Sequence, residues 1–196
     1  MSAQGQGMLR PDVSDKDHAL GRADAPVTLV EYGDYQCPHC WRAHPVVTAV
    51  RALLGDKLRF VFRDFPLTQI HEHALHAAEA TESVATNAGG DAFWAMHDTI
   101  YEHQQDSPIA LDDSHLVKYA ASCGADPEQV ARDLANDTFE EDVRADFMSG
   151  VRSGVNGTPT FFINGVRFEG DWSNPKFFAA ALLEGAAMVG APRGSR

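Results

Sequence analysis

The sequence contains few cysteines, few basic residues and no long apolar run. Its 196 residues include only three cysteines, whereas a small secreted domain held by disulfide bonds normally carries a larger, even number. Lys and Arg total 16 against 28 Asp and Glu, for a formal net charge of −12. This shortage of positive charge argues against a nucleic acid as partner, because phosphate binding requires clustered Lys and Arg. No stretch reaches the roughly 18 apolar residues of a spanning helix, so we expect no membrane span.

The first seven residues are polar and lack the apolar segment of a secretory signal. We therefore expect a cytoplasmic protein. The alternative is a periplasmic or other extracytoplasmic location, if a signal has been trimmed from the chain.

The rest of the composition is that of a globular protein, with 44% hydrophobic and 22% charged residues. Residues 1–22 are polar, and we expect them to form a flexible lead-in. A β-branched and aromatic run at 27–32 predicts a central strand, helical spacing at 41–54 predicts a helix, and alternation at 58–65 predicts a second strand. This order suggests a parallel β-α-β unit.

Helical patterns then fill the chain to about residue 154, and strand signals return on both sides of Asn164-Gly165, a dipeptide typical of a hairpin turn. A last helix begins at Asn174-Pro175. The sequence therefore predicts an α/β core interrupted by an all-helical insertion. The expected segments are the lead-in at 1–22, the core at 23–66 and 155–190, and the insertion at 67–154.

Two cysteines are separated by two residues, in the run Cys37-Pro38-His39-Cys40. The pair follows a predicted strand and opens a predicted helix, so Cys37 stands at a helix N-terminus, where free N–H groups and the helix dipole stabilise a thiolate. Cys40 then lies one turn further and more buried, and Pro38 suits the first turn because it needs no N–H donor there. His39 adds a positive charge or a hydrogen-bond donor near the Cys37 sulfur. We expect Cys37 to be the attacking thiolate and Cys40 the resolving thiol.

The alternative for this pair is half of a zinc site. A tetrahedral zinc ion requires two more ligands, and the chain has no second pair of this spacing. His71, His73 and His76 gather at the start of a predicted helix, but such a group is more often a solvated helix end. We expect no metal and no cofactor.

Two further features accompany the cysteines. The run Gly157-Thr158-Pro159-Thr160 stands directly before a predicted strand, where a proline fits either as a first strand residue or in a cis turn. Glu31 lies in the predicted central strand, six residues before Cys37, where a buried acid requires a hydrogen bond or a raised pKa. Glu31 is either a proton acceptor for Cys40 through water or an edge-exposed carboxylate.

In combination, these motifs resemble the DsbA-like branch of the thioredoxin-fold oxidoreductases. The resemblance covers about residues 17–188. It rests on the runs Val30-Glu31-Tyr32-Gly33-Asp34-Tyr35-Gln36-Cys37-Pro38-His39-Cys40, Phe62-Arg63-Asp64-Phe65-Pro66-Leu67, Phe93-Trp94-Ala95-Met96-His97-Asp98 and Gly154-Val155-Asn156-Gly157-Thr158-Pro159-Thr160-Phe161.

The resemblance implies a thioredoxin fold with an inserted all-helical domain. It also implies that Pro159 is cis and faces the disulfide, and that Thr158 contacts bound substrate, so we expect Pro38, Thr158 and Pro159 to form the substrate surface. The Pro-His dipeptide is similar to that of strongly oxidising members, and Glu31 occupies the position of the family's buried acid.

The resulting prediction is a protein-disulfide oxidoreductase that exchanges disulfides with protein substrates and with a redox partner, most simply as a monomer. One alternative is a glutathione-dependent isomerase or transferase of the same fold, against which Cys40 counts, because such relatives use glutathione in place of a paired cysteine. Another is a non-enzymatic domain that binds a metal through Cys37, Cys40 and a histidine.

Overall fold

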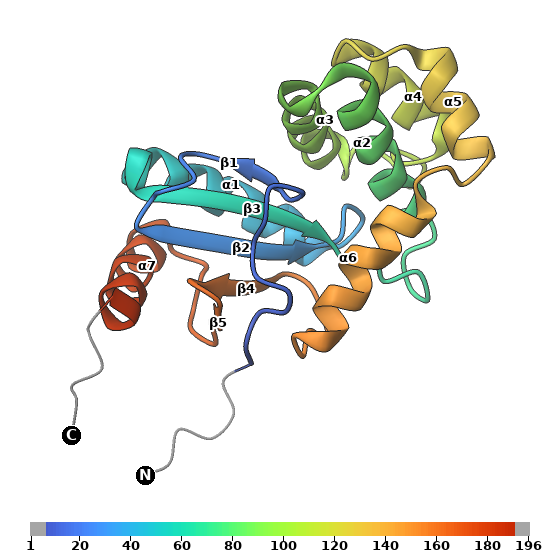
Figure 1. Ribbon diagram of the computed structural model, residues 1–196. Coiled ribbons are helices and arrows are strands. Elements are labelled where there is room, and N and C mark those ends of the chain that lie inside the picture. Colours follow the sequence, from blue (N-terminus) through green and yellow to red (C-terminus); the bar gives the residue numbers. More distant parts are fainter. Residues whose placement is uncertain (1–6, 191–196) are drawn as a thin grey trace.

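The computed structural model describes residues 7–190, which form a five-stranded sheet with helices around it (Figure 1). The strand order is β1-β3-β2-β4-β5, in which β2 and β3 are parallel and the other pairs antiparallel. The strands are β1 (His18–Leu20), β2 (Val27–Gly33), β3 (Leu58–Asp64), β4 (Thr160–Ile163) and β5 (Val166–Arg167). The helices are α1 (Pro38–Leu54), α2 (Ala74–Ala88), α3 (Gly90–His103), α4 (Asp113–Ser122), α5 (Pro127–Ala135), α6 (Glu140–Arg152) and α7 (Pro175–Gly190), with a 3₁₀ turn at Gly55–Lys57.

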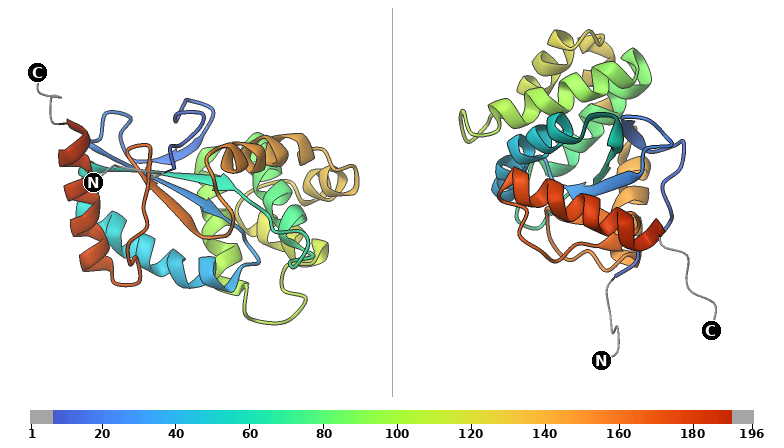
Figure 2. Two further views of the ribbon diagram at one scale, coloured as in Figure 1. Left: turned by 90° about the horizontal axis from the view of Figure 1, so that it is seen from below. Right: turned by 90° about the vertical axis from the view of Figure 1, so that its left-hand side faces the viewer.

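The central strand β2 is buried on both faces, which explains its near-continuous apolar sequence. Because side chains alternate across a strand, Leu29 packs with α1 and α7, whereas Val30 and Tyr32 pack on the opposite face with Phe147 of α6. Seen from below the sheet, α1 lies on one side and the N-terminal segment on the other (Figure 2). By the same alternation, Glu31 belongs to the face that α1 covers.

Five consecutive helices, α2 to α6, separate β3 from β4, so the α/β core with a helical insertion is confirmed. α2 packs against each of the other helices of this insertion. The last of them, α6, leaves the insertion and passes the end of the sheet (Figure 1). The Asn164-Gly165 turn is also confirmed, since both residues have positive φ, 47° and 83°, as a tight hairpin turn requires.

The structure differs from the expected lead-in. Residues 18–20 form β1, which pairs antiparallel with β3 at the edge of the sheet, and Met8 bridges to Val166 at the opposite edge. The ring of His18 stacks on Phe93 of α3 at a centroid distance of 3.7 Å. A strand of three residues has no periodic pattern from which it could be recognised.

Gly150 allows α6 to approach the sheet closely. A Cβ atom at this position would lie 2.6 Å from the Phe65 ring and 3.1 Å from the Tyr32 ring. Gly150→Ala should therefore destabilise the protein by about 1–3 kcal/mol through overpacking, measured as a lower midpoint of urea unfolding. The matched control is Gly90→Ala, where no atom lies within 4 Å and the lower backbone entropy of alanine should be neutral or stabilising. Equal midpoints for the two variants would contradict this account of the contact.

Candidate active site

Cys37 lies at the junction between β2 and α1. It is the N-cap residue of α1, with extended backbone angles, and its N–H donates to the Asp34 carbonyl at 3.0 Å. Both Cys37 and Cys40 are buried, and both are free thiols. Pro38 and His39 between them are exposed, as is Trp41, so the polypeptide around the Cys37 sulfur forms part of the surface.

The environment of Cys37 strongly favours its thiolate. Its pKa is lowered from 9.0 to about 5, chiefly by a hydrogen bond from the Cys40 thiol and further by the Thr158 side chain and the backbone N–H groups of Cys40 and His39. Burial opposes this effect. The donors of the first helical turn thus act on the sulfur as the sequence predicts.

Cys40 has the opposite character. Burial raises its pKa well above 9.0, and the nearby charges of Cys37 and Glu31 raise it further, although the Asp34 N–H lies 3.4 Å from its sulfur. Glu31 is itself buried on β2, and burial together with the negative charge of Cys37 raises the pKa of its carboxyl to about 8. The burial of Glu31 excludes the edge-exposed alternative.

The segment before β4 comes next to the cysteines from a distant part of the sequence. The Cys37 sulfur lies 3.5 Å from the Thr158 carbonyl oxygen, across a separation of 121 residues. The Thr158–Pro159 peptide is cis, as the family resemblance implies. The structure therefore brings together Cys37, Cys40, Thr158 and Pro159.

His39 occupies a different position from the one expected. Its ring is exposed and makes no hydrogen bond or ion pair with the described residues 7–190. Only its backbone N–H acts on Cys37. A role for the imidazole in setting the Cys37 pKa stays a prediction.

Sequence reasoning missed the groups that hold the turn before Cys37. The buried Asp34 carboxylate accepts hydrogen bonds from the backbone of Gln36 at 2.7 Å and of Leu67 at 2.8 Å, and it pairs with His71 at 2.8 Å. From the end of α3, the Gln104 side chain donates to the Tyr35 carbonyl at 2.6 Å and to the Cys37 carbonyl at 3.2 Å. These contacts link the active-site turn to the helical insertion.

Other contacts around the turn involve aromatic residues of α3. The Tyr35 hydroxyl is 3.0 Å from Nδ1 of His97, which is buried and surrounded by aromatic rings. Burial lowers the pKa of His97 to about 3, so its ring is neutral. The third cysteine, Cys123, lies at the end of α4 and is half-buried.

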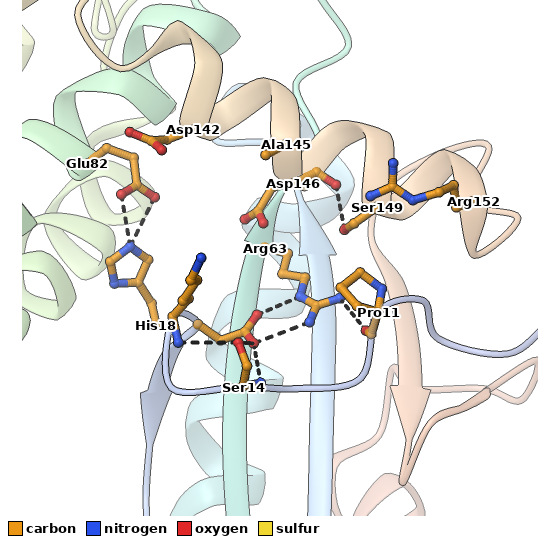
Figure 3. Close-up of a pocket in the computed structure, with 12 residues that line it drawn as sticks. Pro11, Ser14, His18, Arg63, Glu82, Asp142, Ala145, Asp146, Ser149 and Arg152 are labelled. Carbon is orange, nitrogen blue, oxygen red and sulfur yellow. Dashed lines mark hydrogen bonds and ion pairs between the residues drawn. The ribbon is translucent and has the colours of Figure 1, made fainter.

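A separate charged pocket lies between the N-terminal segment, β3 and α6 (Figure 3). Arg63 is its central cation, held by Asp17 at 2.6 Å and by the Tyr32 hydroxyl at 2.9 Å. His18 pairs with Glu82 at 3.0 Å. These pairs join β1 and the N-terminal segment to the rest of the molecule, and none of the cysteines lines the pocket.

Comparison with known families gives one match over most of the chain. The family described as Thioredoxin matches residues 13–181. The chain is also similar to BdbD from Bacillus subtilis, with a TM-score of 0.79 and 24% identity over 93% of this chain and 97% of that one. A second similar structure is MdbA, a thiol-disulfide oxidoreductase from Corynebacterium diphtheriae, with a TM-score of 0.69 and 19% identity over 93% and 95% of the two chains.

A curated relative with higher identity has a different name. The chain is 40% identical over 181 residues to the Na(+)/H(+) antiporter NhaA 1 of Mycolicibacterium vanbaalenii, and the match covers 91% of this chain and 27% of that protein. The chain thus spans about a quarter of the length of the curated relatives it matches.

These relatives correct the expectation about partners. That expectation combined protein thiols and disulfides with a redox partner, no membrane span and a favoured monomer. The part of this expectation that excludes a membrane is wrong, because a relative 40% identical over this region is named as a Na(+)/H(+) antiporter. Within residues 7–190, no helix is both long enough and apolar enough to cross a bilayer.

The pKa of Cys37 can be measured directly through the ultraviolet absorbance of its thiolate. In the reduced protein the absorbance should rise with a midpoint near pH 5. Cys40→Ala removes the thiol whose hydrogen bond is the chief cause of the lowered pKa, so the midpoint should rise by roughly 1 pH unit or more. Cys37→Ser is the control and should lack the transition. A midpoint near 8.5, the value of an ordinary thiol, would contradict the described environment.

Proposed function

Since the chain belongs to the thioredoxin family and has the fold of DsbA-like thiol–disulfide oxidoreductases, we propose that Cys37 and Cys40 exchange disulfides with protein substrates. The observation that carries the proposal is the opposite effect of the structure on the two sulfurs. Cys37 is stabilised as a thiolate, and Cys40, one helical turn away, is stabilised as a thiol.

In the oxidising direction the reaction starts from a Cys37–Cys40 disulfide. A substrate thiolate attacks the Cys37 sulfur, a substrate–Cys37 disulfide forms, and Cys40 leaves with the electron pair of the broken bond. A second substrate thiolate then attacks the substrate sulfur of this mixed disulfide and releases Cys37 as a thiolate. The substrate loses two electrons, and the cysteine pair gains them.

Glu31 supplies the proton that this sequence needs. Cys40 leaves as a buried thiolate, which is unfavourable, whereas the carboxyl of Glu31 has a pKa of about 8 and is mostly protonated at neutral pH. Glu31 donates its proton toward Cys40 in this direction and accepts it in the reverse direction, directly or through a water molecule. It is a positioning and proton-exchange group rather than a nucleophile.

The lowered pKa of Cys37 favours the oxidising direction. A stabilised thiolate stabilises the reduced pair, and each pKa unit corresponds to about 1.4 kcal/mol, or about 30 mV for a two-electron couple. A fall from 9.0 to about 5 then shifts the potential by on the order of 100 mV.

Trapping of a mixed disulfide tests the assignment of the two cysteines. Cys40→Ser should accumulate a covalent complex with a disulfide-containing protein such as scrambled, oxidised ribonuclease, because its Cys37 thiolate attacks a substrate disulfide, one substrate sulfur leaves as a thiolate, and the thiol that would resolve the mixed disulfide is missing. Cys37→Ser should form none and should lose disulfide-exchange activity by several orders of magnitude. The complexes are measured on non-reducing gels, with the double variant as control.

Equal trapping by both single variants would contradict the proposed roles. If Cys40→Ser retained full activity whenever glutathione was supplied, the glutathione-dependent alternative would be correct instead.

Glu31 should make the stability of the reduced protein depend on pH. Its pKa is about 8 in the folded state against 4.5 as the reference value, so the folded state binds more protons between these values and loses stability as pH rises through them. Glu31→Gln should remove this loss, so its free energy of unfolding relative to wild type should increase by roughly 3–5 kcal/mol from pH 4.5 to pH 8.5. Urea unfolding of both proteins at several pH values measures the difference, and a constant difference would contradict the raised pKa.

A further inference from the structure

A second group of ionisable side chains lies within the helical insertion. His76 and Glu79 are one turn apart on α2, and they face Asp137 in the turn between α5 and α6. One potential ligand atom of each side chain lies within 4.8 Å of the other two. None of the three takes part in the active site described above.

Glu79 is the unusual member of this group. The residue is 1% exposed, and within residues 7–190 neither of its carboxylate oxygens makes a hydrogen bond of ordinary geometry. Asp137 and Glu140 add negative charge around it, while the His76 ring and the Phe139 N–H favour its charged form. A buried carboxylate in this setting is strongly unfavourable without a cation.

His76 is held in the orientation of a metal ligand. Its Nδ1 is 2.6 Å from an oxygen of Asp113, the first residue of α4, and its Nε2 points toward Asp137 at 3.8 Å. Metal-binding histidines typically donate one ring N–H to a carboxylate, which fixes the ring and leaves the other nitrogen for the metal. Asp113 has this outer position here.

We propose that this group binds a divalent transition-metal cation of the zinc type, with Nε2 of His76 and the carboxylates of Glu79 and Asp137 as ligands and Asp113 as the group that orients His76. One nitrogen and two oxygens, with a fourth position for water, match an open tetrahedral zinc site. Calcium and magnesium prefer ligand sets made of oxygen alone. The proposed ion differs from the expectation of no metal.

The geometry leaves the ion a path to its ligands. The side chains of His76 and Asp137 are 35% and 60% exposed, and Glu79 lies beneath them. Zinc bonds of about 2.0–2.1 Å require the ligand atoms to be closer together than they are here. The exposed Asp137 side chain can rotate to close this difference.

A second group of potential ligands is formed by His44, His97 and Asp98. It does not indicate a metal site in the same way. Nε2 of His44 is 2.8 Å from Asp98, and Nδ1 of His97 bonds the Tyr35 hydroxyl. These polar atoms already have partners within the protein. The unpartnered carboxylate therefore distinguishes the site on α2.

Zinc binding tests the proposal in the tag-free, full-length chain carrying Cys37→Ser and Cys40→Ser, which removes the competing thiolates. Calorimetric titration at pH 7.5 should show one Zn²⁺ per chain, with tighter binding than at pH 6, because Glu79 and His76 release protons. Zinc at 100 times its Kd should raise the Tm by about 5–10 °C. Cobalt bound at the same site should show visible d–d bands without a thiolate charge-transfer band.

Conservative variants locate the ion. Glu79→Gln and Asp137→Asn should each weaken zinc binding by about 100-fold or more, and Asp113→Asn by roughly 10- to 100-fold. Glu72→Gln, which removes an exposed carboxylate next to this helix end, should leave the affinity unchanged. Without metal, Glu79→Gln should melt at or above the temperature of its parent, because it removes a buried charge.

Several results would overturn the proposal. Absence of zinc binding, or binding that survives Glu79→Gln, would show that this group is not the site. Loss of binding in Asp98→Asn, or a thiolate band with cobalt, would place the ion elsewhere. Tighter binding of Ca²⁺ or Mg²⁺ than of Zn²⁺ would contradict the proposed type of ion. A metal-free Glu79→Gln protein that melts below its parent would also contradict it, since Glu79 would then be stabilising without an ion.

Discussion

Cys37 stands where β2 ends and α1 begins, and the N–H groups of the first helical turn surround its sulfur. The remaining features of the site follow from this position. Cys40 lies one turn further along, on the buried side of α1, where a charge is unfavourable. The alternation of β2 brings Glu31 to the face that α1 covers, where burial keeps its carboxyl protonated. The start of α1 thus lowers the pKa of Cys37, whereas burial against the same helix raises the pKa values of Cys40 and Glu31.

The helical insertion contributes to this arrangement. The Gln104 side chain donates to the carbonyls of Tyr35 and Cys37. The Asp34 carboxylate accepts a hydrogen bond from the Leu67 N–H, which connects the same turn to the loop after β3. A thiolate at the helix start requires a fixed turn, because the N–H groups must keep their direction toward the sulfur. The insertion is therefore part of the support of the active site, in addition to any substrate surface that it forms.

Local patterns were sufficient to predict the parts of the fold whose signals are local. The apolar run of β2, the Asn164-Gly165 turn and the position of Cys37 at a helix start all follow from neighbouring residues. The short edge strand β1 could not be predicted, because three residues show no alternation and the strand is recognised only by its pairing with β3 in the folded structure. Likewise, the bond from Gln104 to Tyr35 spans 69 residues, and the missing partner of Glu79 is visible only after the helices pack. The sequence groups His76 with His71 and His73 as a solvated helix end, whereas the structure places it with Glu79 and Asp137.

The environment of Cys37 stabilises the reduced pair through its thiolate. The reduction potential of the Cys37–Cys40 pair, measured by equilibration with glutathione buffers of known potential, tests this claim most directly. We expect a value between about −200 and −120 mV, well above the potential of about −270 mV that is typical of thioredoxin. A value at or below about −270 mV would contradict the account, because a thiolate stabilised by several pKa units would then have no effect on the equilibrium.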